Sequence, residues 1–548
     1  MKAITITIAL TLCLFNCKSL DSHTEIITKP TSSINWNNEV IYHVMPRSFY
    51  DSNGDLHGDL NGFVEKLDYL KELGVTTILF TPLYESGFYH NYFPTDYYAI
   101  DPEYGTKEDY INFVKAVHKK GLKFIMDMET QYAQGEHIWF ADSYKNPQSE
   151  YSDFVYYSDS LNVYPEQIFM ESRSPLFGFK TWPNDRAYNI VILDLNKPKV
   201  KSWMKDFYTY WVDPNGDGNF DDGVDGFRID HIMDDLDYKG IITNMYQDFW
   251  KPIFEACKAI NPNIFVLGEQ SNWADTGEQM IKQSGADAAF NFGLKFAISN
   301  EEKTMDMFSS ADKKETSIDP QQIHKVVQET MDTFNNGTYS VTFLENHDTA
   351  RYATVVQEHD GLKRIGAILN LFLPGLPSIY YGQELGVTGR IVDWGSDTNH
   401  LPLREAFPWT DNPEDEGIAL FYKNTGEWWD ISFWQTDAIK QLALTNQKTD
   451  KNSLWHHYKK LLDIRKTHEA FRLGDYAPLL TDVNGVLAFE RKTDNETVAV
   501  LVNLTGESIV VPRFNIDDWQ GETLYGKIKT NASKSLVLDP YGYLVLKK

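Results

Sequence analysis

The feature that most constrains the fold is a short apolar segment followed by an amphipathic helical segment, which recurs along most of the chain. Such alternation predicts a parallel sheet, because each helix returns the chain to the edge where the next strand starts. The expected strands lie at residues 39–45, 75–82, 122–128, 225–230, 263–269, 287–292, 339–348 and 378–384. This series fits an α/β fold of the (β/α)8 TIM-barrel type, in which DAAFNF is the weak sixth strand.

Two regions interrupt the alternation. Residues 129–196 follow the third expected strand and are too long for a simple loop, so we expect an inserted lobe there. From residue 472 to residue 548 the pattern changes to short strands separated by turns, which predicts a C-terminal antiparallel β-sandwich. The barrel domain would then comprise residues 37–128 and 197–471.

The N-terminus has the pattern of an export signal. It reads MKAITITIALTLCLFNC, with a basic start and an apolar stretch that is too short to span a membrane. The segment LFNC resembles a loose lipobox, which predicts a signal peptide over residues 1–17 with lipid attached to Cys17. The alternative is a plain secretory peptide cleaved near the same position. Residues 18–36 are polar and read as a tether, so we expect a periplasmic or outer-membrane-anchored lipoprotein that touches the membrane only through this anchor.

Charge narrows the range of partners. The chain carries 51 Lys and Arg against 78 Asp and Glu, a formal charge of −27. This balance argues against nucleic acid and anionic membrane surfaces as partners, because both would repel it. It favours a neutral or cationic ligand.

Charged residues nevertheless stand inside one apolar strand, in the stretch GVDGFRIDHIMDD at 223–235. Arg228 and Asp230 are two apart and so project from the same face of a strand. Buried charges are costly unless paired, so the two form either a structural ion pair or part of a reaction centre. Catalytic groups of TIM barrels gather at the carboxyl ends of the strands. The other expected strand ends carry Asp127, Glu269, His347 and Asp348.

From about residue 37 to the C-terminus, the chain resembles the α-amylase superfamily, glycoside hydrolase family 13. GFRID at 226–230, GE at 268–269 and FLENHD at 343–348 match its three catalytic strand-end motifs. GVTTILFTP, TDYYAIDPEYGT and LPGLPSIYYGQE match its flanking signatures in the same order. The resemblance implies a retaining hydrolase that cleaves α-1,4-glucosidic bonds in starch, glycogen or maltooligosaccharides by double displacement.

The same resemblance implies roles for individual residues. Asp230 would be the nucleophile, Glu269 the general acid and base, and Asp348 the carboxylate that stabilises the transition state. The residues expected to bind substrate are Tyr92, Asp127, Arg228, His347 and Arg404. No organic cofactor is expected. The expected partners are an α-glucan polysaccharide or oligosaccharide and glycan-uptake proteins of the cell envelope.

Other activities remain open at this point. An α-glucosidase, a neopullulanase or a transglycosylase of the same family would share the catalytic motifs. A non-enzymatic glycan-binding relative is disfavoured, because Asp230, Glu269 and Asp348 are all present. Gln131 and Tyr132 replace the family's Asn-His pair, so we expect the calcium site near the inserted lobe to be missing. Met233 replaces a lysine that usually contacts the leaving-group side.

A first-loop metal site is also expected. The stretch DSNGDLHGD at 51–59 offers alternating oxygen ligands, which suit a hard cation such as Ca²⁺. It resembles the first-loop calcium site of oligo-1,6-glucosidase relatives, and the alternative is a polar turn. The expected ligands are Asp51, Asn53, Asp55, the His57 carbonyl and Asp59. For the similar stretch DPNGDGNFDDG at 213–223, a calcium loop and a turn are equally compatible with the sequence.

Overall fold

The computed structural model describes residues 34–548 apart from 169–177, 184–185, 300–317 and the single positions 336, 395, 513, 515 and 520. The predicted signal peptide and most of the predicted tether therefore lie outside the described residues. In the described part of the chain, no helix is both long enough and apolar enough to cross a membrane.

Eight parallel strands close into a barrel, which confirms the predicted (β/α)8 architecture. Their order around the barrel is β1-β14-β13-β12-β11-β10-β5-β2. The bounds are β1 Ile41–Val44, β2 Thr77–Phe80, β5 Lys123–Met128, β10 Gly226–Ile232, β11 Phe265–Gln270, β12 Ala288–Phe290, β13 Tyr339–Thr342 and β14 Leu376–Tyr380. The weak sixth strand is present as β12, which pairs in parallel with both of its neighbours.

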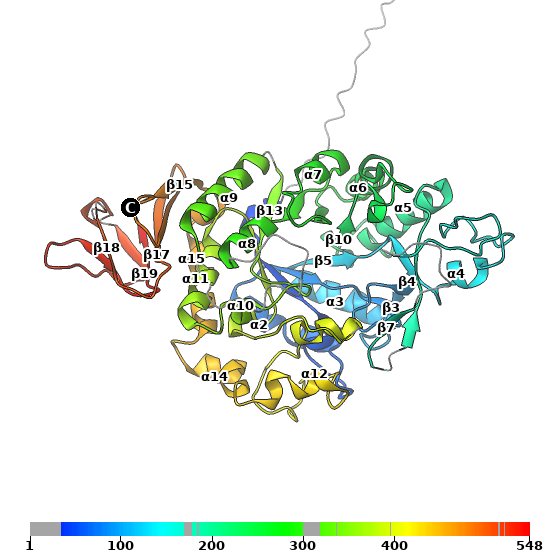
Figure 1. Cartoon of the computed structure of the whole chain (residues 1–548), viewed down its shortest axis with the longest axis horizontal. Coiled ribbons are helices and arrows are strands. Elements are labelled where there is room, and N and C mark those ends of the chain that lie inside the picture. Colours follow the sequence, from blue (N-terminus) through cyan, green and yellow to red (C-terminus); the bar gives the residue numbers. More distant parts are fainter. Residues whose placement is uncertain are drawn as a thin grey trace, which may run out of the picture.

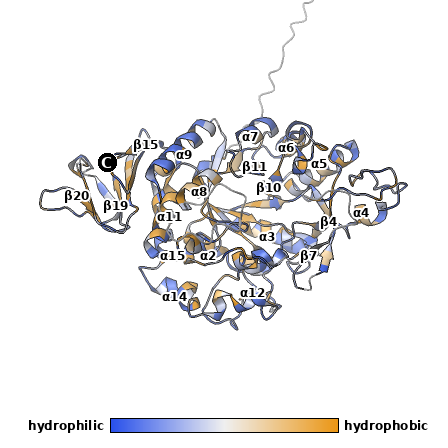
Figure 2. Cartoon of the chain, in the orientation of Figure 1, coloured by the Kyte–Doolittle hydropathy of each residue, from blue (hydrophilic) through white to orange (hydrophobic). Residues whose placement is uncertain are grey.

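Helices cover the outside of the barrel (Figure 1). In Figure 2 the barrel strands are mostly hydrophobic, and many of the helices are hydrophilic on one side, as expected for helices that bury a single face. Helix α3 shows how sequence sets a boundary, since Thr106 and Asp109 form a capping box at its start. The helices of this layer are α1 Leu60–Glu65, α2 Leu67–Leu73, α3 Lys107–Lys119, α5 Pro198–Val212, α6 Lys251–Ile260, α7 Glu278–Ser284, α8 Phe292–Ser299, α9 Pro320–Thr333, α10 Tyr352–Val355, α11 Asp360–Phe372 and α15 Leu454–Thr467.

Small elements occupy the segment between β5 and α5, where the inserted lobe was predicted. Helix α4 (Ile138–Ser143) and two short antiparallel pairs lie in it, and α4 stands at the right-hand end of the molecule in Figure 1. The pairs are β6 Tyr132–Gln134 with β9 Ile190–Ile192, and β7 Phe179–Thr181 with β8 Arg186–Tyr188. A further pair, β3 Tyr84–Ser86 with β4 Pro94–Ile100, follows β2. The exact bounds of the lobe stay a prediction.

The C-terminal part is an antiparallel sheet at the opposite end of the molecule (Figure 1). Its five strands run in the order β15 Asp475–Leu479, β16 Val486–Lys492, β17 Thr497–Asn503, β21 Tyr543–Lys547 and β19 Glu522–Gly526, and a second pair joins β18 Ile509–Val511 to β20 Leu536–Leu538. The sheet is fastened to the barrel by buried Arg491, which donates from β16 to the carbonyl of Phe372 at 2.8 Å.

A long segment between β14 and α15 packs over the barrel as short helices. Helices α12 (Glu427–Asp430), α13 (Ile439–Leu442) and α14 (Leu444–Thr449) belong to it, and α16 (Ala470–Leu473) follows α15. Trp429 and Trp434 from this segment are buried in the main apolar core. The segment also contributes one wall of the pocket described next.

Candidate active site

A pocket of about 400 Å³ opens at the carboxyl ends of the barrel strands. The strands supply Asp230 from β10 and Asp348 from just beyond β13. Tyr132 enters from the insertion, and His400 and Arg404 enter from the segment after β14. The site is therefore built from distant parts of the sequence that only barrel closure brings together.

The Arg228 guanidinium lies beneath the pocket floor. Its contacts explain why a charged residue is tolerated inside this apolar strand. Its side chain is 1% exposed, and its NH1 group donates to Asp127 at 2.8 Å and to Asp230 at 2.6 Å. Its NH2 group donates to Glu269 on the neighbouring strand β11. Asp127 and Arg228 are register partners on β5 and β10, so strand pairing places the two charges side by side. One buried cation thus joins three carboxyl groups and offsets part of the cost of burying them, although burial still raises the pKa of Asp127 to about 7.

Asp230 and Glu269 approach each other closely enough to act on one bond. One oxygen from each carboxylate and one ring nitrogen of His231 all lie within 4.8 Å of one another. Retaining glycosidases hold their two carboxyl groups about 5–5.5 Å apart, whereas inverting enzymes need about 6.5–9.5 Å to admit a water. Glu269 also accepts a hydrogen bond from Trp273 Nε1 at 3.3 Å. Burial raises the pKa of Glu269, and the nearby Arg228 opposes that shift.

Asp230 is held ionised by its neighbours. Burial acts to raise its pKa, but the combined effect of His231, Arg228 and a hydrogen bond from Glu129 lowers it to about 2. Glu129 is 1% exposed and its pKa is raised well above the usual range, first by burial and then by the charge of Asp230. Its Oε1 accepts the backbone amide of Gln131 at 2.6 Å. Both influences favour the protonated form of Glu129, which can then donate a hydrogen bond to the Asp230 carboxylate.

Asp348 completes the acidic set from the other side of the pocket. It is paired with Arg404 NH2 at 3.1 Å and with His347 Nε2 at 2.8 Å. Although burial opposes it, these neighbours lower the pKa of Asp348 well below its usual range. The Tyr92 hydroxyl donates to Asp127 at 2.7 Å and lies 2.6 Å from His347 Nε2. The aromatic rings of Tyr92 and His347 are stacked with their centroids 5.4 Å apart.

All eight residues that the sequence singled out for catalysis or substrate binding meet at this site. They divide into residues that line the pocket and residues that lie beneath it. Asp127 and Arg228 are at most 1% exposed and lie beneath the floor, where they hold the other carboxylates. The pocket surface carries Tyr92, Asp230, His347, Asp348 and Arg404. Glu269, itself 1% exposed, reaches the pocket through the contact with Asp230.

The sequence reasoning missed several residues that surround the same pocket. Glu129 follows Asp127 by two positions. Residues two apart on a strand share a face, so this spacing could have placed Glu129 on the same face as Asp127. His231 directly follows Asp230, and Trp273 stands four positions after Glu269. Asp397 and His400 come from an irregular segment with no periodicity, and nothing in the sequence alone points them toward the pocket.

The convergence of these carboxylates agrees with an independent finding. The family model of the alpha-amylase catalytic domain matches residues 43–474. The chain belongs to the α-amylase family. It is thus a glycoside hydrolase of the family that its strand-end motifs indicated.

Relatives in the α-amylase family match over nearly the whole chain. Alpha-amylase 3 of Dictyoglomus thermophilum is 30% identical over 515 residues, which cover 93% of each chain. Trehalose-6-phosphate hydrolase of Bacillus subtilis is 28% identical over 570 residues, covering 93% of this chain and 97% of the relative. The crystal structure of α-amylase from H. orenii matches with a TM-score of 0.72 at 26% identity, covering 93% of this chain and 99% of that one.

Two positions depart from the α-amylase family pattern and take on other contacts. Gln131 donates from its side chain to the backbone carbonyl of Asp230 at 3.3 Å, so it supports the strand end. Tyr132 lines the pocket and donates its hydroxyl proton to Asp237 at 2.6 Å. Neither side chain supplies the imidazole that the family pattern has at the second position.

The 51–59 loop of this α-amylase family member is organised by its own side chains. Asp51 accepts the backbone amides of Asn53 at 3.0 Å and Leu56 at 2.8 Å. Asp59 caps helix α1 by accepting the amide of Gly62 at 2.7 Å. Asn53 and Asp55 accept the amides two residues ahead of them at 2.9 and 2.8 Å. Carboxylate and amide oxygens thus gather in a tight turn, and this donor chemistry suits a hard cation.

The acidic oxygens of this loop do not converge to a point. Among the described residues, the group formed by Asp230, His231 and Glu269 is the only one in which three acidic or histidine ligand atoms lie within 4.8 Å of one another. The 213–223 loop shows the same turn chemistry, since Asp213 accepts the amides of Gly216 at 3.0 Å and Gly218 at 2.9 Å. In both loops the carboxylate oxygens accept backbone amides and are not gathered around one point.

Proposed function

We propose that this α-amylase family enzyme hydrolyses α-1,4-glucosidic bonds in starch, glycogen or maltooligosaccharides with retention of configuration. The observation that carries the proposal is the approach of Asp230 and Glu269 oxygens to within 4.8 Å beside the 400 Å³ pocket. That spacing suits direct attack by a carboxylate and leaves no room for a water between the two groups.

The reaction would proceed in two displacements. Asp230 attacks the anomeric carbon while Glu269 gives its proton to the departing glycosidic oxygen, which forms a covalent glycosyl-enzyme. Glu269, now a carboxylate, takes a proton from water as that water attacks the same carbon and releases Asp230. The low pKa of Asp230 and the raised pKa of Glu269 support this division of roles.

The remaining pocket residues would bind and orient the sugar. Asp348, kept ionised by His347 and Arg404, would accept hydroxyl hydrogens and stabilise the positive charge that develops on the ring. Tyr92 would pack under the ring at the cleavage subsite. Asp127 and Arg228 would act one layer deeper, by fixing Tyr92 and Asp230.

A second candidate is an exo-acting α-glucosidase. The segment from Ser396 to Arg404 contributes one wall of the pocket, and a walled pocket admits a chain end more easily than the middle of a polymer. Chromatography of the products from maltoheptaose, pullulan and p-nitrophenyl α-glucoside separates these activities. Mixed short maltooligosaccharides support the amylase, whereas glucose alone supports the glucosidase, and panose from pullulan indicates a neopullulanase.

We also propose that the 51–59 loop binds Ca²⁺ through Asp51, Asn53, Asp55, the His57 carbonyl and Asp59. The ion would stabilise the loop beside helix α1 and take no part in the chemical step. Export with lipid on Cys17, and delivery of products to glycan-uptake proteins, are proposed from the N-terminal sequence. Radiolabelled palmitate should enter the wild-type protein and not a Cys17→Ala variant.

A further inference from the structure

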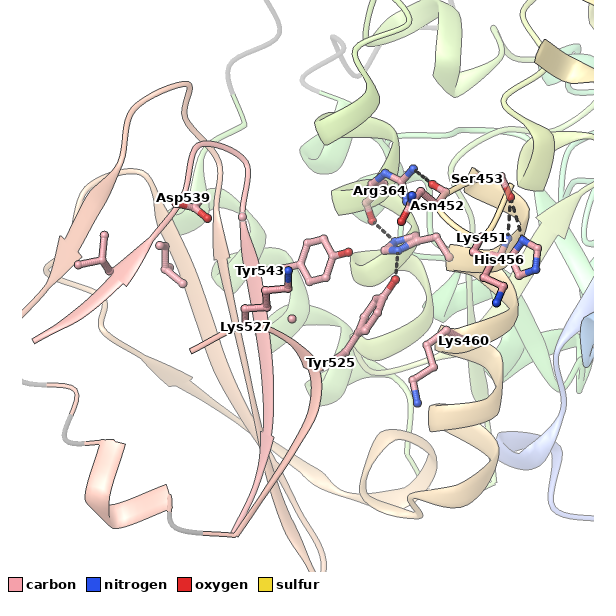
Figure 3. Close-up of a pocket in the computed structure, with 15 residues that line it drawn as sticks. Arg364, Lys451, Asn452, Ser453, His456, Lys460, Tyr525, Lys527, Asp539 and Tyr543 are labelled. Atoms are coloured by element: carbon pink, nitrogen blue, oxygen red, sulfur yellow. Dashed lines mark hydrogen bonds between the residues drawn. The ribbon is translucent and has the colours of Figure 1, made fainter. Parts of the chain in front are cut away.

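A second pocket, of about 770 Å³, lies where the C-terminal sheet meets the barrel. Helices α11 and α15 form its barrel side, and strands β19 and β21 form its other side (Figure 3). It shares no lining residue with the catalytic pocket. Its volume falls within the range of about 300–1,000 Å³ that small-ligand sites occupy.

Cations line this pocket from four separate segments. They are Arg364 of α11, Lys451 before α15, Lys460 of α15 and Lys527 after β19. Arg364 is already paired with Asp360 at 2.8 Å, so the three lysines carry the unpaired charge. Across the described residues, Lys451, Lys460 and Lys527 have no carboxylate within ion-pair distance, and the Asp539 carboxylate is already paired with Lys529 at 2.6 Å. Three unpaired lysines thus line one pocket of a chain whose formal charge is −27. Their mutual repulsion is relieved when an anion binds.

The floor of the pocket is aromatic and rigidly held. Tyr525 and Tyr543 project from the C-terminal sheet toward α15, with their ring centroids 5.0 Å apart (Figure 3). Buried His457 lies 3.0 Å from the carbonyl of Arg364 through Nε2 and 2.9 Å from the Tyr525 hydroxyl through Nδ1. A carbonyl only accepts, so Nε2 carries the proton and, in the neutral ring, Nδ1 accepts from Tyr525. This bridge fixes Tyr525 against the barrel.

We propose that this pocket binds a phosphorylated saccharide. The lysines surround the dianionic phosphate with charge-assisted hydrogen bonds, and the C–H face of the sugar ring packs on Tyr525 and Tyr543. A neutral sugar would leave the lysines unused, and a nucleic acid would meet the repulsion of the whole acidic surface. The inference does not depend on the proposed hydrolysis, because the two pockets are separate.

Isothermal titration calorimetry of the full-length mature protein at low salt tests the proposal. The probes are glucose 6-phosphate, inorganic phosphate and maltose. The test variant replaces Lys451, Lys460 and Lys527 together by Gln. The matched control replaces three exposed lysines on the barrel helices, Lys71, Lys119 and Lys205, and so makes the same change in net charge.

Glucose 6-phosphate is expected to bind the wild type and the control equally, to bind the test variant about tenfold or more weakly, and to bind more weakly at high salt. Both variants should keep wild-type starch hydrolysis, since neither alters the catalytic pocket. Absence of glucose 6-phosphate binding, or equal weakening in test and control variants, overturns the proposal. Inorganic phosphate or maltose binding as tightly as glucose 6-phosphate also overturns it, because the site would then recognise only the anion or only the sugar.

Discussion

Replacement of Glu129 by Leu tests how the nucleophile is kept ionised. Protonated Glu129 donates to Asp230, and that hydrogen bond is one of three influences, with His231 and Arg228, that lower the pKa of Asp230 from an ordinary 3.8 to about 2. The whole change corresponds to about 2 kcal/mol in favour of the carboxylate.

The direction of the change in pH dependence follows from which form of Asp230 reacts. Asp230 attacks only as a carboxylate, so its contribution is present above its folded pKa and is lost as the pH falls through that value. Without Glu129 this loss should begin at a higher pH than in the wild type. Because the hydrogen bond also orients Asp230, kcat/KM at pH 6 should fall about tenfold, which equals about 1.4 kcal/mol.

The assay is initial-rate hydrolysis of maltoheptaose from about pH 1.5 to pH 7, with circular dichroism at each pH to verify folding. Glu129→Gln is the matched control, because its amide still donates to Asp230 and its oxygen still accepts the Gln131 amide. It should keep the acid limb within a few tenths of a pH unit of wild type. A folded Leu variant with the wild-type acid limb, or a Gln variant as impaired as the Leu variant, would refute the reasoning.

Three further outcomes are expected. Asp230→Asn and Glu269→Gln should each lower kcat by at least about 10²–10⁴-fold with an unchanged melting temperature, and wild-type activity in either variant contradicts the assigned roles. Arg228→Met should destabilise the protein by about 3–5 kcal/mol in urea denaturation, because it leaves three buried carboxylates without their cation, and an unchanged midpoint denies the shared pairing. Dialysed wild-type protein should retain calcium by atomic absorption and melt at a lower temperature after chelation, whereas an Asp51→Asn variant should not respond to the chelator; calcium-free wild-type protein rules the site out.

Much of the barrel was readable because its signals are local. An apolar segment of strand length followed by an amphipathic helix carries its own period, and even the weak DAAFNF segment formed β12 in its expected place. Strand-end position also pointed to four carboxylates, Asp127, Asp230, Glu269 and Asp348, because parallel strands end at one edge of a barrel. The resemblance to the α-amylase family then singled out three of them for catalysis.

Residues without such signals could not be placed. His400 and Asp397 reach the pocket from a segment with no regular period. Their positions depend on packing over hundreds of residues of sequence separation.

By itself, the sequence determined which strands form the barrel and which acids follow them, since periodicity and strand-end position are properties of neighbouring residues. The resemblance to the α-amylase family singled out three of those acids. The tertiary structure alone decided how those acids are charged. Arg228 shared among three carboxylates, a protonated Glu129 beside Asp230, and four cations gathered at the edge of the C-terminal sheet all arise from contacts between distant segments. Electrostatic energies depend on such distances and on burial, and neither can be read along the chain.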